Sequence, residues 1–466
     1  VREELARLAR ENNLVMRPDE ALVGEVIHLG EWPVGIAGEF DPAFLEVPDE
    51  MVITSMRLHQ RYFAFEDAQG GLQNHFATLA ATHVKDPKIV AQGNQKVLAS
   101  RLSDAKFFFA EDKKHSMDDW NHTLDSVVFQ AKLPKGAQTI GDKVRRIVEI
   151  VETLSGSEGA RDAAKYCKAD LASKAVGEFP ELQGTMGKHY ARHHRLGAGV
   201  ADAIEQHWWP KGQGAALPRS RDAALVALAD KMDTIVGCFA VGLEPSGSAD
   251  PFGLRRAAIG IWQIVLDQRD DELFYKTRGA AIDVLGRHGV TLKDRSKLDD
   301  FFKQRLQGIL VESGIPVQDV AGALAQNFEM PADARARAQA CAKISKEARE
   351  VFKRVANILD DARAKKLEPG TAPDPKLFVG DVERTLHAAI EQAQQRETQP
   401  RANHDYAAVF ESLERLRPTV AAFFDKGGVM VMDPDPKLRD NRLALLNWFI
   451  APYLAIADFR LLGGAQ

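Results

Sequence analysis

The sequence predicts a mainly helical protein of several domains, with a smaller α/β portion at its N-terminal end. The chain has 466 residues, enough for three or four domains at roughly 100–200 residues each. From about residue 140 onward, apolar residues recur at every third or fourth position, which is the spacing of amphipathic helices. Short stretches rich in β-branched residues are confined to the first ~130 residues, where Gly and Pro interrupt them.

The N-terminal portion has the pattern of a small sheet. Two short segments, ALVGEVIHL (21–29) and PVGIAGEF (33–40), have the composition of strands. Two longer ones, MVITSMRLHQRYFAFED (51–67) and LQNHFATLAAT (72–82), flank AQGG, which is typical of a hairpin turn. We therefore predict strands in these segments and a hairpin at AQGG.

A helix is predicted to follow and to pack on this sheet. Asp86 is a good N-cap, and Pro87 is well suited to the first helical position. Four apolar residues then lie at near-helical spacing and should form the packed stripe: Val97, Leu102, Ala105 and Phe109.

The rest of the chain divides by its helix-breaking segments. SGSEG, LEPSGSADPFG, ESGIPVQD and FEMPAD separate helical patterns, and LEPGTAPDPK is a Pro-rich connector near the end. Long helices are expected at Glu383–Gln395 and Tyr406–Phe424. The predicted domains are 1–135 (α/β), 136–268 (helical), 269–349 (helical linker) and 350–466 (helical).

Composition and motifs exclude several classes of protein. The three cysteines, Cys167, Cys238 and Cys341, are far apart, so neither a disulfide framework nor a structural zinc site is indicated, and a reducing, cytoplasmic setting fits. No run approaches ~18 apolar residues, so no membrane span is predicted. The net charge of −5 gives no overall basicity, which leaves only local basic patches for a polyanion. Motifs for a P-loop, a Rossmann site, a GxSxG elbow, an HExxH zinc site and the ATP sites of aminoacyl-tRNA synthetases are missing from the sequence.

A group of His and Asp residues on consecutive helices suggests a metal site. KADLASKAVGEFPELQGTMGKHYARHH (168–194) is followed by His207, Asp230 and Asp233. A metal-dependent phosphohydrolase of the HD type needs an adjacent His-Asp pair among ligands that converge on the metal. The only such dipeptide is His404-Asp405, far along the chain, and FPELQG stands where the pair is expected.

Two interpretations of this group stay open. In one, a metal ion binds at His189, His207 and Asp230. In the other, which we favour, the metal site has been lost. The histidines (His189, His193, His194 and His207) are then surface or hydrogen-bonded residues, and Asp170 and Glu178 organise Lys and Arg side chains.

Three basic clusters are candidates for binding an anion. Arg255 and Arg256 stand in the first turn of a predicted helix, an unfavourable place for cations unless they meet a phosphate or a carboxylate such as Asp250, Asp230 or Asp233. Residues 331–370 carry ten Lys and Arg against six Asp and Glu. There, FKRVANIL places Arg354 near Asn357. In DPKLRDNRLALL, Lys437 precedes three further candidates for reading unpaired bases: Arg439, Asn441 and Arg442.

These segments resemble a known family, the β subunit of bacterial heterotetrameric glycyl-tRNA synthetase. The resemblance covers KADLASKAVGEFPELQGTMGKHYA, VALADKMDTIVGCFAVGLEPSGSADPFGLRRAAIGI and VMVMDPDPKLRDNRLALLNWFIAPYLAIADF. MRLHQRYFAF and GNQKVLASRLSDAKFFF also fit, in family order. Because β subunits of this family extend further at the N-terminus and the chain starts at Val1, an N-terminal part is expected to be missing.

The resemblance implies a role in glycyl-tRNA synthesis. Glycine is activated with ATP and Mg²⁺ in a separate α subunit, so no cofactor, metal or catalytic residue is expected on this chain. The β subunit binds tRNA(Gly) within a cytoplasmic α2β2 assembly. It has a central HD-like domain and a C-terminal anticodon-binding domain of the DALR type. The anticodon-side candidates are Arg354, Asn357, Arg439, Asn441 and Arg442, and the acceptor-side candidates are Lys168, Lys174, Arg255 and Arg256. The alternatives are an HD-type phosphohydrolase and a scaffold that does not touch RNA.

Overall fold

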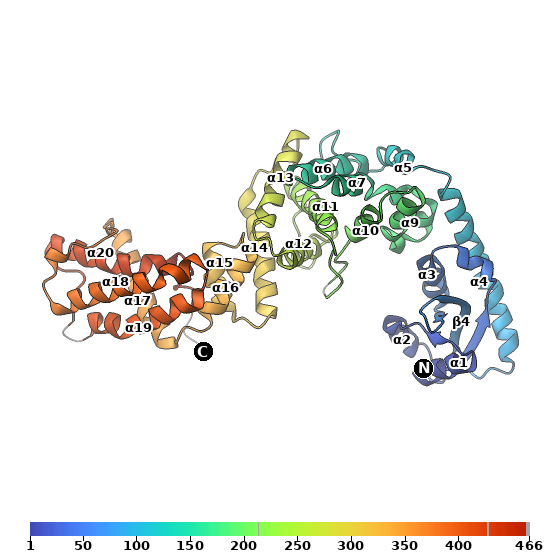
Figure 1. Ribbon diagram of the computed structural model, residues 1–466, viewed down its shortest axis with the longest axis horizontal. Helices are drawn as coiled ribbons and strands as arrows, with labels where there is room; N and C mark the ends of the chain where they lie inside the picture. Colours follow the sequence, from blue (N-terminus) through green and yellow to red (C-terminus); the bar gives the residue numbers. More distant parts are fainter. Residues whose placement is uncertain (213, 426–427, 463–466) are drawn as a thin grey trace. The chain divides into compact units, whose positions relative to one another are not determined.

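The computed structural model describes residues 1–212, 214–425 and 428–462, and these residues form twenty α-helices and one four-stranded sheet (Figure 1). The predicted mainly helical fold is confirmed. The chain forms two compact units, the first of residues 1–233 and 284–290, the second of 234–283 and 291–466. Helices α11 and α13 contribute residues to both units.

The sheet lies in the first unit and is antiparallel throughout. Its strand order is β1-β3-β4-β2, with β1 at Val15–Met16, β2 at Val34–Glu39, β3 at Phe63–Glu66 and β4 at Leu72–Ala80. The hairpin predicted at AQGG is confirmed, because residues 67–71 join β3 to β4. Asp67 shapes this turn by accepting the backbone N–H groups of Gln69 and Gly71 at 2.9 and 2.8 Å.

Two of the predicted strands are helices instead. Residues 21–29 belong mostly to α2 (Glu20–Ile27), and residues 51–60 belong to α3 (Asp49–Gln60). In α2, Asp19 caps the first turn by accepting the N–H of Leu22 at 2.9 Å. The buried residues Leu22, Val23 and Val26 share one helical face. This spacing outweighs the strand preference of β-branched residues.

The helix predicted after the sheet is confirmed as α4 (Pro87–Asp112), which packs against β2. Asp86 caps it by accepting the N–H of Lys88 at 2.9 Å. The predicted stripe is wrong at Val97, which is exposed. The buried position is Leu98, because its spacing to the buried Leu102 and Ala105 is four and seven residues.

The remaining helices of the first unit pack in neighbouring pairs such as α6 with α7 and α9 with α10. Helix α1 (Arg2–Glu11) precedes the sheet. The others are α5 (Met117–Leu124), α6 (Ile140–Thr153), α7 (Glu158–Tyr166), α8 (Lys174–Glu178), α9 (Thr185–His193), α10 (Ala198–Gln206) and α11 (Arg221–Ala240), with a 3₁₀ helix, η2, at Ala169–Ala172.

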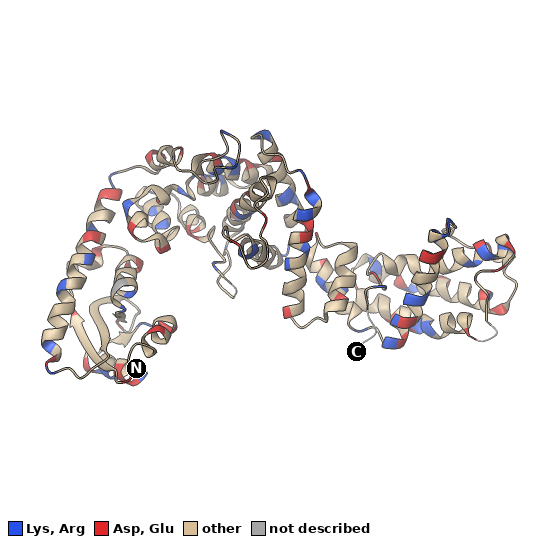
Figure 2. Cartoon of the chain, turned by 180° about the vertical axis from the view of Figure 1, so that it is seen from behind, with Lys and Arg blue, Asp and Glu red and all other residues tan. Residues whose placement is uncertain are grey.

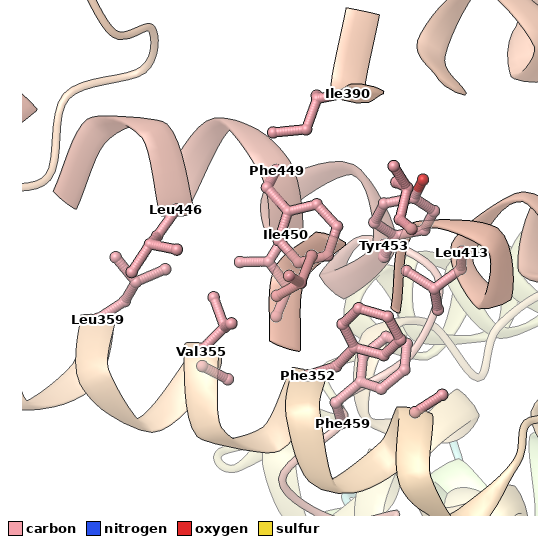
Figure 3. Packing of buried hydrophobic residues seen from close by; sticks show 14 of the residues in the cluster. Phe352, Val355, Leu359, Ile390, Leu413, Leu446, Phe449, Ile450, Tyr453 and Phe459 are labelled. Atoms are coloured by element: carbon pink, nitrogen blue, oxygen red, sulfur yellow. The ribbon is translucent and has the colours of Figure 1, made fainter. Parts of the chain in front are cut away.

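The second unit is built from helices around its own core. They are α12 (Leu254–Gln268), α13 (Leu273–Arg287), α14 (Arg295–Glu312), α15 (Val317–Gln326), α16 (Pro331–Cys341), α17 (Lys346–Ala364), α18 (Asp381–Ala402), α19 (Tyr406–Phe424) and α20 (Pro436–Leu454). Figure 3 shows Phe352, Val355 and Leu359 of α17 facing side chains of α20 across this core. The two long helices predicted near the end of the chain are present as α18 and α19. Among the described helices, none has the length and apolar character needed to cross a membrane.

Candidate functional site

Five buried charged residues lie together in the first unit, where the sequence suggested a lost metal site. We call Lys143, Arg146, Lys168, Asp230 and Asp233 the charge centre. Arg146 donates from Nε to Asp233 Oδ1 at 2.6 Å and from Nη2 to Oδ2 at 3.1 Å. Lys143 Nζ lies 3.0 Å from both Asp233 Oδ2 and Asp230 Oδ1, and Lys168 Nζ lies 2.8 Å from Asp230 Oδ2.

Local structure places each member of the charge centre. Thr139 and Asp142 form a capping box that starts α6, each side chain bonding the backbone N–H of the other at 3.0 Å. Lys143 and Arg146 therefore follow about one turn apart on α6, and Asp230 and Asp233 have the same spacing on α11. Lys168 precedes η2, and its ammonium lies 3.5 Å from the centroid of a Trp208 ring.

The charge centre holds its two carboxylates in the ionised form. Burial by itself raises the pKa of Asp230, but Lys143 and Lys168 outweigh burial and hold that pKa well below its ordinary value. Burial likewise raises the pKa of Asp233, and Lys143 and Arg146 bring the net shift below the ordinary value. Both aspartates are thus anions surrounded by fixed cations.

These cations stand where a metal ion would have to bind Asp230. The residues that face Asp230 are Lys143 and Lys168, whereas FPELQG (179–184) forms the turn before α9. Among the described residues, no group of three or more His, Cys, Asp or Glu is placed to hold a metal ion. An ammonium group supplies charge but no ligand, so the donor set does not fit a metal centre.

The histidines behave largely as the favoured interpretation expects. His189 Nε2 lies 3.0 Å from Glu50 Oε2, and His193 is exposed. His207 is fully buried, with Nδ1 2.5 Å from the carbonyl oxygen of Ile204. Burial lowers the pKa of His207 well below its ordinary value, so this imidazole is neutral. The rings of His193 and the half-buried His194 lie against each other.

The prediction that Asp170 and Glu178 organise Lys and Arg side chains is wrong. Asp170 Oδ2 instead accepts the backbone N–H groups of Gly184 at 2.6 Å and Gly187 at 3.0 Å, and thereby fixes the start of α9. Glu178 is exposed, and no ion pair of its carboxylate is seen among the described residues. Asp230 and Asp233 perform the organising role expected of these two residues.

The acceptor-side candidates are divided between the two units. In the first unit, Lys168 is buried in the charge centre, and Lys174 is exposed at the start of α8. In the second, Arg255 and Arg256 lie in the first turn of α12, as predicted.

The Arg255 guanidinium bonds backbone carbonyl groups and none of the three carboxylates considered for it. Its guanidinium donates to the carbonyl oxygens of Gly247 and Ala249 at 2.6 and 3.3 Å, fastening the loop before α12. Asp250 instead caps α12 by accepting the N–H groups of Leu254 and Arg255 at 2.8 and 2.9 Å. Arg256 is exposed.

Of the anticodon-side candidates, Arg354 and Asn357 are exposed and lie about one turn apart on α17. The Arg354 guanidinium lies 4.6 Å from the centroid of the Phe424 ring. Arg439 is partly exposed and donates to its neighbour Asp440 at 2.8 Å. In Figure 2, Lys and Arg are interspersed with Asp and Glu along these C-terminal helices.

The other two candidates, Asn441 and Arg442, point into the protein and bind backbone and side chains there. Asn441 Oδ1 accepts the N–H of Asp374 at 2.6 Å, and Asn441 Nδ2 donates to the Asp374 carbonyl oxygen at 3.1 Å. Arg442 donates from Nε to Glu383 at 2.8 Å and from Nη1 to Asp433 at 2.6 Å.

Sequence reasoning missed three residues of these sites: Lys143, Arg146 and Glu383. A signal for Lys143 and Arg146 was present in IGDKVRRIVEI. The two residues are three positions apart, and Ile150 follows Arg146 by four, so all three lie on the apolar face of the helix. A cation on such a face needs a buried anion nearby. Glu383 carried a weaker signal as the third residue of α18, a capping position.

Comparisons with known proteins show similarity along most of the chain. The family model described as "Glycyl-tRNA synthetase beta subunit" matches residues 1–325. The "Glycine--tRNA ligase beta subunit" of Anaeromyxobacter sp. (strain K) is 41% identical over 476 residues, which cover 98% of this chain and 66% of the relative. The proteins of that name from Citrifermentans bemidjiense and Acidithiobacillus ferrooxidans are each 39% identical, over 98% and 99% of this chain and 67% of the relative. The chain thus spans about two thirds of the length of these relatives.

Proposed function

The chain belongs to the glycyl-tRNA synthetase beta subunit family, and on that premise we propose that it binds tRNA(Gly) and positions it for glycylation. The reaction joins glycine to tRNA(Gly) and converts ATP to AMP and diphosphate. It takes place in a separate α subunit, which uses ATP and Mg²⁺, while this chain binds neither. The two subunits act together in the cytoplasm as a heterotetramer of two α and two β subunits.

The observation that carries this proposal is the similarity to β subunits over nearly the whole chain. A β subunit of this kind contributes by positioning. Holding the 3′ end of the tRNA beside glycyl-adenylate raises its effective concentration, and no covalent step on β is required. The helical C-terminal part serves as the anticodon-binding domain, and the central helical part is HD-like.

The chemistry of the charge centre supports this proposal over an HD-type phosphohydrolase. A hydrolase of that class needs a metal-activated water. Here Asp230 is neutralised by Lys143 and Lys168, and Asp233 by Arg146 and Lys143. The central helical part is therefore best explained as a support whose metal site is replaced by ion pairs.

We propose that the exposed and partly exposed candidates contact the RNA. These are Arg354, Asn357 and Arg439 on the anticodon side and Lys174 and Arg256 on the acceptor side. The buried or engaged candidates, Lys168, Arg255, Asn441 and Arg442, hold the backbone around them. Sequence-specific RNA recognition favours unpaired loops and ends, which exposed Arg and Asn side chains can reach.

The test measures tRNA(Gly) binding by the complex of both subunits. Replacing Arg354 and Arg439 by Ala should weaken binding roughly thirtyfold or more, because each Arg can lose about 1–3 kcal/mol of RNA contact and every 1.4 kcal/mol is tenfold. Glycine-dependent ATP–diphosphate exchange in the α subunit should stay unchanged. Arg192→Ala, an exposed Arg on α9, is the matched control.

Two results would contradict parts of this proposal. Unchanged affinity in the double variant would remove the anticodon-side assignment. A wild-type complex in which this chain makes no contribution to tRNA binding would favour the scaffold alternative.

A further inference from the structure

Two loops beside the start of α20 expose apolar side chains. In residues 374–380 Val379 is 63% exposed, and in residues 428–435 Met430 and Met432 are 59% and 41% exposed. Exposed apolar side chains that are gathered in one region often mark a binding surface. We call Val379, Met430 and Met432 the apolar loop surface.

Three buried side chains hold both loops, and we call Glu383, Asn441 and Arg442 the loop clamp. Glu383 Oε2 accepts the backbone N–H groups of Val379 and Gly380 at 2.8 and 2.9 Å. Its other oxygen, Oε1, accepts from Arg442 Nε at 2.8 Å.

The guanidinium of Arg442 also fixes the second loop. Arg442 Nη1 donates to the Met430 carbonyl oxygen at 3.0 Å and to Asp433 Oδ2 at 2.6 Å. The side chain of Asn441 bonds both the backbone N–H and the backbone carbonyl oxygen of Asp374, at the start of the first loop. One buried network thus fixes the backbone at Val379 and at Met430.

Such a network is better explained by geometry than by stability. A buried ion pair costs so much desolvation that apolar residues of equal volume often stabilise a fold as well or better. What the loop clamp supplies is a single arrangement of two loops, each of which lacks helix or strand hydrogen bonds for much of its length. Its position therefore suggests that the shape of the loops matters.

Both lysines and carboxylates stand at the edge of these loops. Asp374 and Asp435 each cap a helix by accepting the N–H of Lys376 at 3.0 Å and of Lys437 at 2.9 Å. Asp433 is paired with Arg442. The side chains of Lys376 and Lys437 are exposed, and no ion pair of either is seen in the described part of the chain.

We propose that the loop clamp consists of positioning residues that hold the apolar loop surface for unpaired nucleotides of the tRNA. The bases pack on Val379, Met430 and Met432, while Lys376 and Lys437 face the phosphates. Unpaired RNA presents base faces to flat or apolar side chains and phosphates to cations, which matches this surface. The inference rests on the proposed function, because it names the part of the chain that touches the RNA.

The first experiment tests the surface. A tRNA(Gly) transcript and a hairpin of its anticodon stem-loop are titrated with the complex of both subunits. Val379→Ser with Met430→Ser should weaken binding of both RNAs about tenfold, the size expected for losing one packed base. Val317→Ser is the matched control, because Val317 is 54% exposed on α15 in the same unit and its change should leave affinity unchanged.

The second experiment tests positioning against simple loss of stability. Arg442→Lys and Glu383→Gln should raise the KM for tRNA about tenfold, comparable to losing the packed base itself, and leave kcat and ATP–diphosphate exchange unchanged. Arg349→Lys is the control, because Arg349 makes a similar buried pair with Asp319 at 2.7 Å and also bonds two backbone carbonyl groups. It should lower the urea midpoint as much as Arg442→Lys does and leave the KM for tRNA unchanged.

The outcomes separate this inference from the proposed function. If the wild-type complex binds tRNA but neither set of variants differs from its control, the inference fails and the proposed function stands. If this chain contributes nothing to tRNA binding, both fail. If the Ser variants reduce recovery of the α subunit on gel filtration and leave RNA affinity unchanged, the loops form a protein interface and the inference is overturned.

Discussion

Two aspartates show how this chain stabilises buried carboxyl groups. Asp233 is a fully buried anion that binds two cations, whereas Asp170 is a buried carboxyl bonded to two backbone amides. The difference in partners gives the two aspartates opposite pKa shifts. Cations lower the pKa of Asp233 despite its burial, while burial raises the pKa of Asp170 to about 6.

The raised pKa of Asp170 predicts a pH dependence of stability. The ordinary value is 3.8, so between about pH 4 and pH 6 the folded protein binds this proton more tightly than the unfolded chain does. The free energy of unfolding should therefore fall as pH rises through this window, by about 3 kcal/mol from this residue. Urea unfolding at several pH values measures it.

Asp170→Asn removes this titration while keeping an oxygen acceptor for the two backbone N–H groups. The variant should gain stability relative to wild type as pH rises from about 4 to 6.5. Asp202→Asn, at an exposed carboxylate paired with Arg192, is the control and should show no such gain. Parallel profiles for wild type and Asp170→Asn would mean that the pKa of Asp170 is ordinary.

At the scale of elements, the turns decide how neighbouring helices meet. Gly184, the N-cap of α9, has a φ of +82°, and its backbone N–H binds Asp170. A side chain there would also overlap Trp208, whose ring packs against Lys168 of the charge centre. The turn before α9 is thus fixed by Asp170 on one side and bounded on the other by Trp208, which contacts the charge centre through Lys168.

Gly184→Ala should therefore be strongly destabilising. The left-handed backbone costs an L-residue about 1–2 kcal/mol, and overlap with Trp208 adds about 1–3 kcal/mol. Gly136→Ala separates the two costs, because Gly136 has a φ of +89° but open space around its Cβ position. Urea unfolding should show the larger loss for Gly184→Ala, and equal losses would exclude the overlap.

The sequence patterns predict the helices more accurately than they predict the contacts between residues. Asp86 and Pro87 marked the start of α4, and the Tyr406–Phe424 pattern coincides with α19, because caps and helical periodicity are local properties. The strand prediction for residues 51–60 is wrong because it follows composition, whereas the segment forms α3. Asn441 and Arg442 were identified as important, but their inward direction depends on Asp374 and Glu383, which lie 67 and 59 residues away. Distant pairing of that kind leaves no trace in a local pattern.

The molecule as a whole has two compact units, and each buries a cysteine that can report on it. Cys167 lies in the first unit and Cys341 in the second, and both are fully buried. Burial raises the pKa of each thiol to about 12. Since the thiolate is the reactive form, neither should react with a thiol reagent in the folded protein.

Labelling in increasing urea should therefore follow the opening of each unit. Because the chain forms two compact units, we expect Cys167 and Cys341 to become reactive at different urea concentrations, as in proteins whose domains unfold in steps. Mass spectrometry of the labelled peptides measures the two midpoints. Coincident midpoints would show that the chain unfolds as one cooperative body.

The charge centre has a consequence for how the protein is made. Lys143 and Lys168 supply the positive charge beside Asp230 from within the chain itself. A fold that relied on a metal ion there would depend on metal supply and on a loading step after synthesis. This chain carries the counter-ions of Asp230 covalently, so the charge centre forms as the chain folds, without a separate loading step at that position.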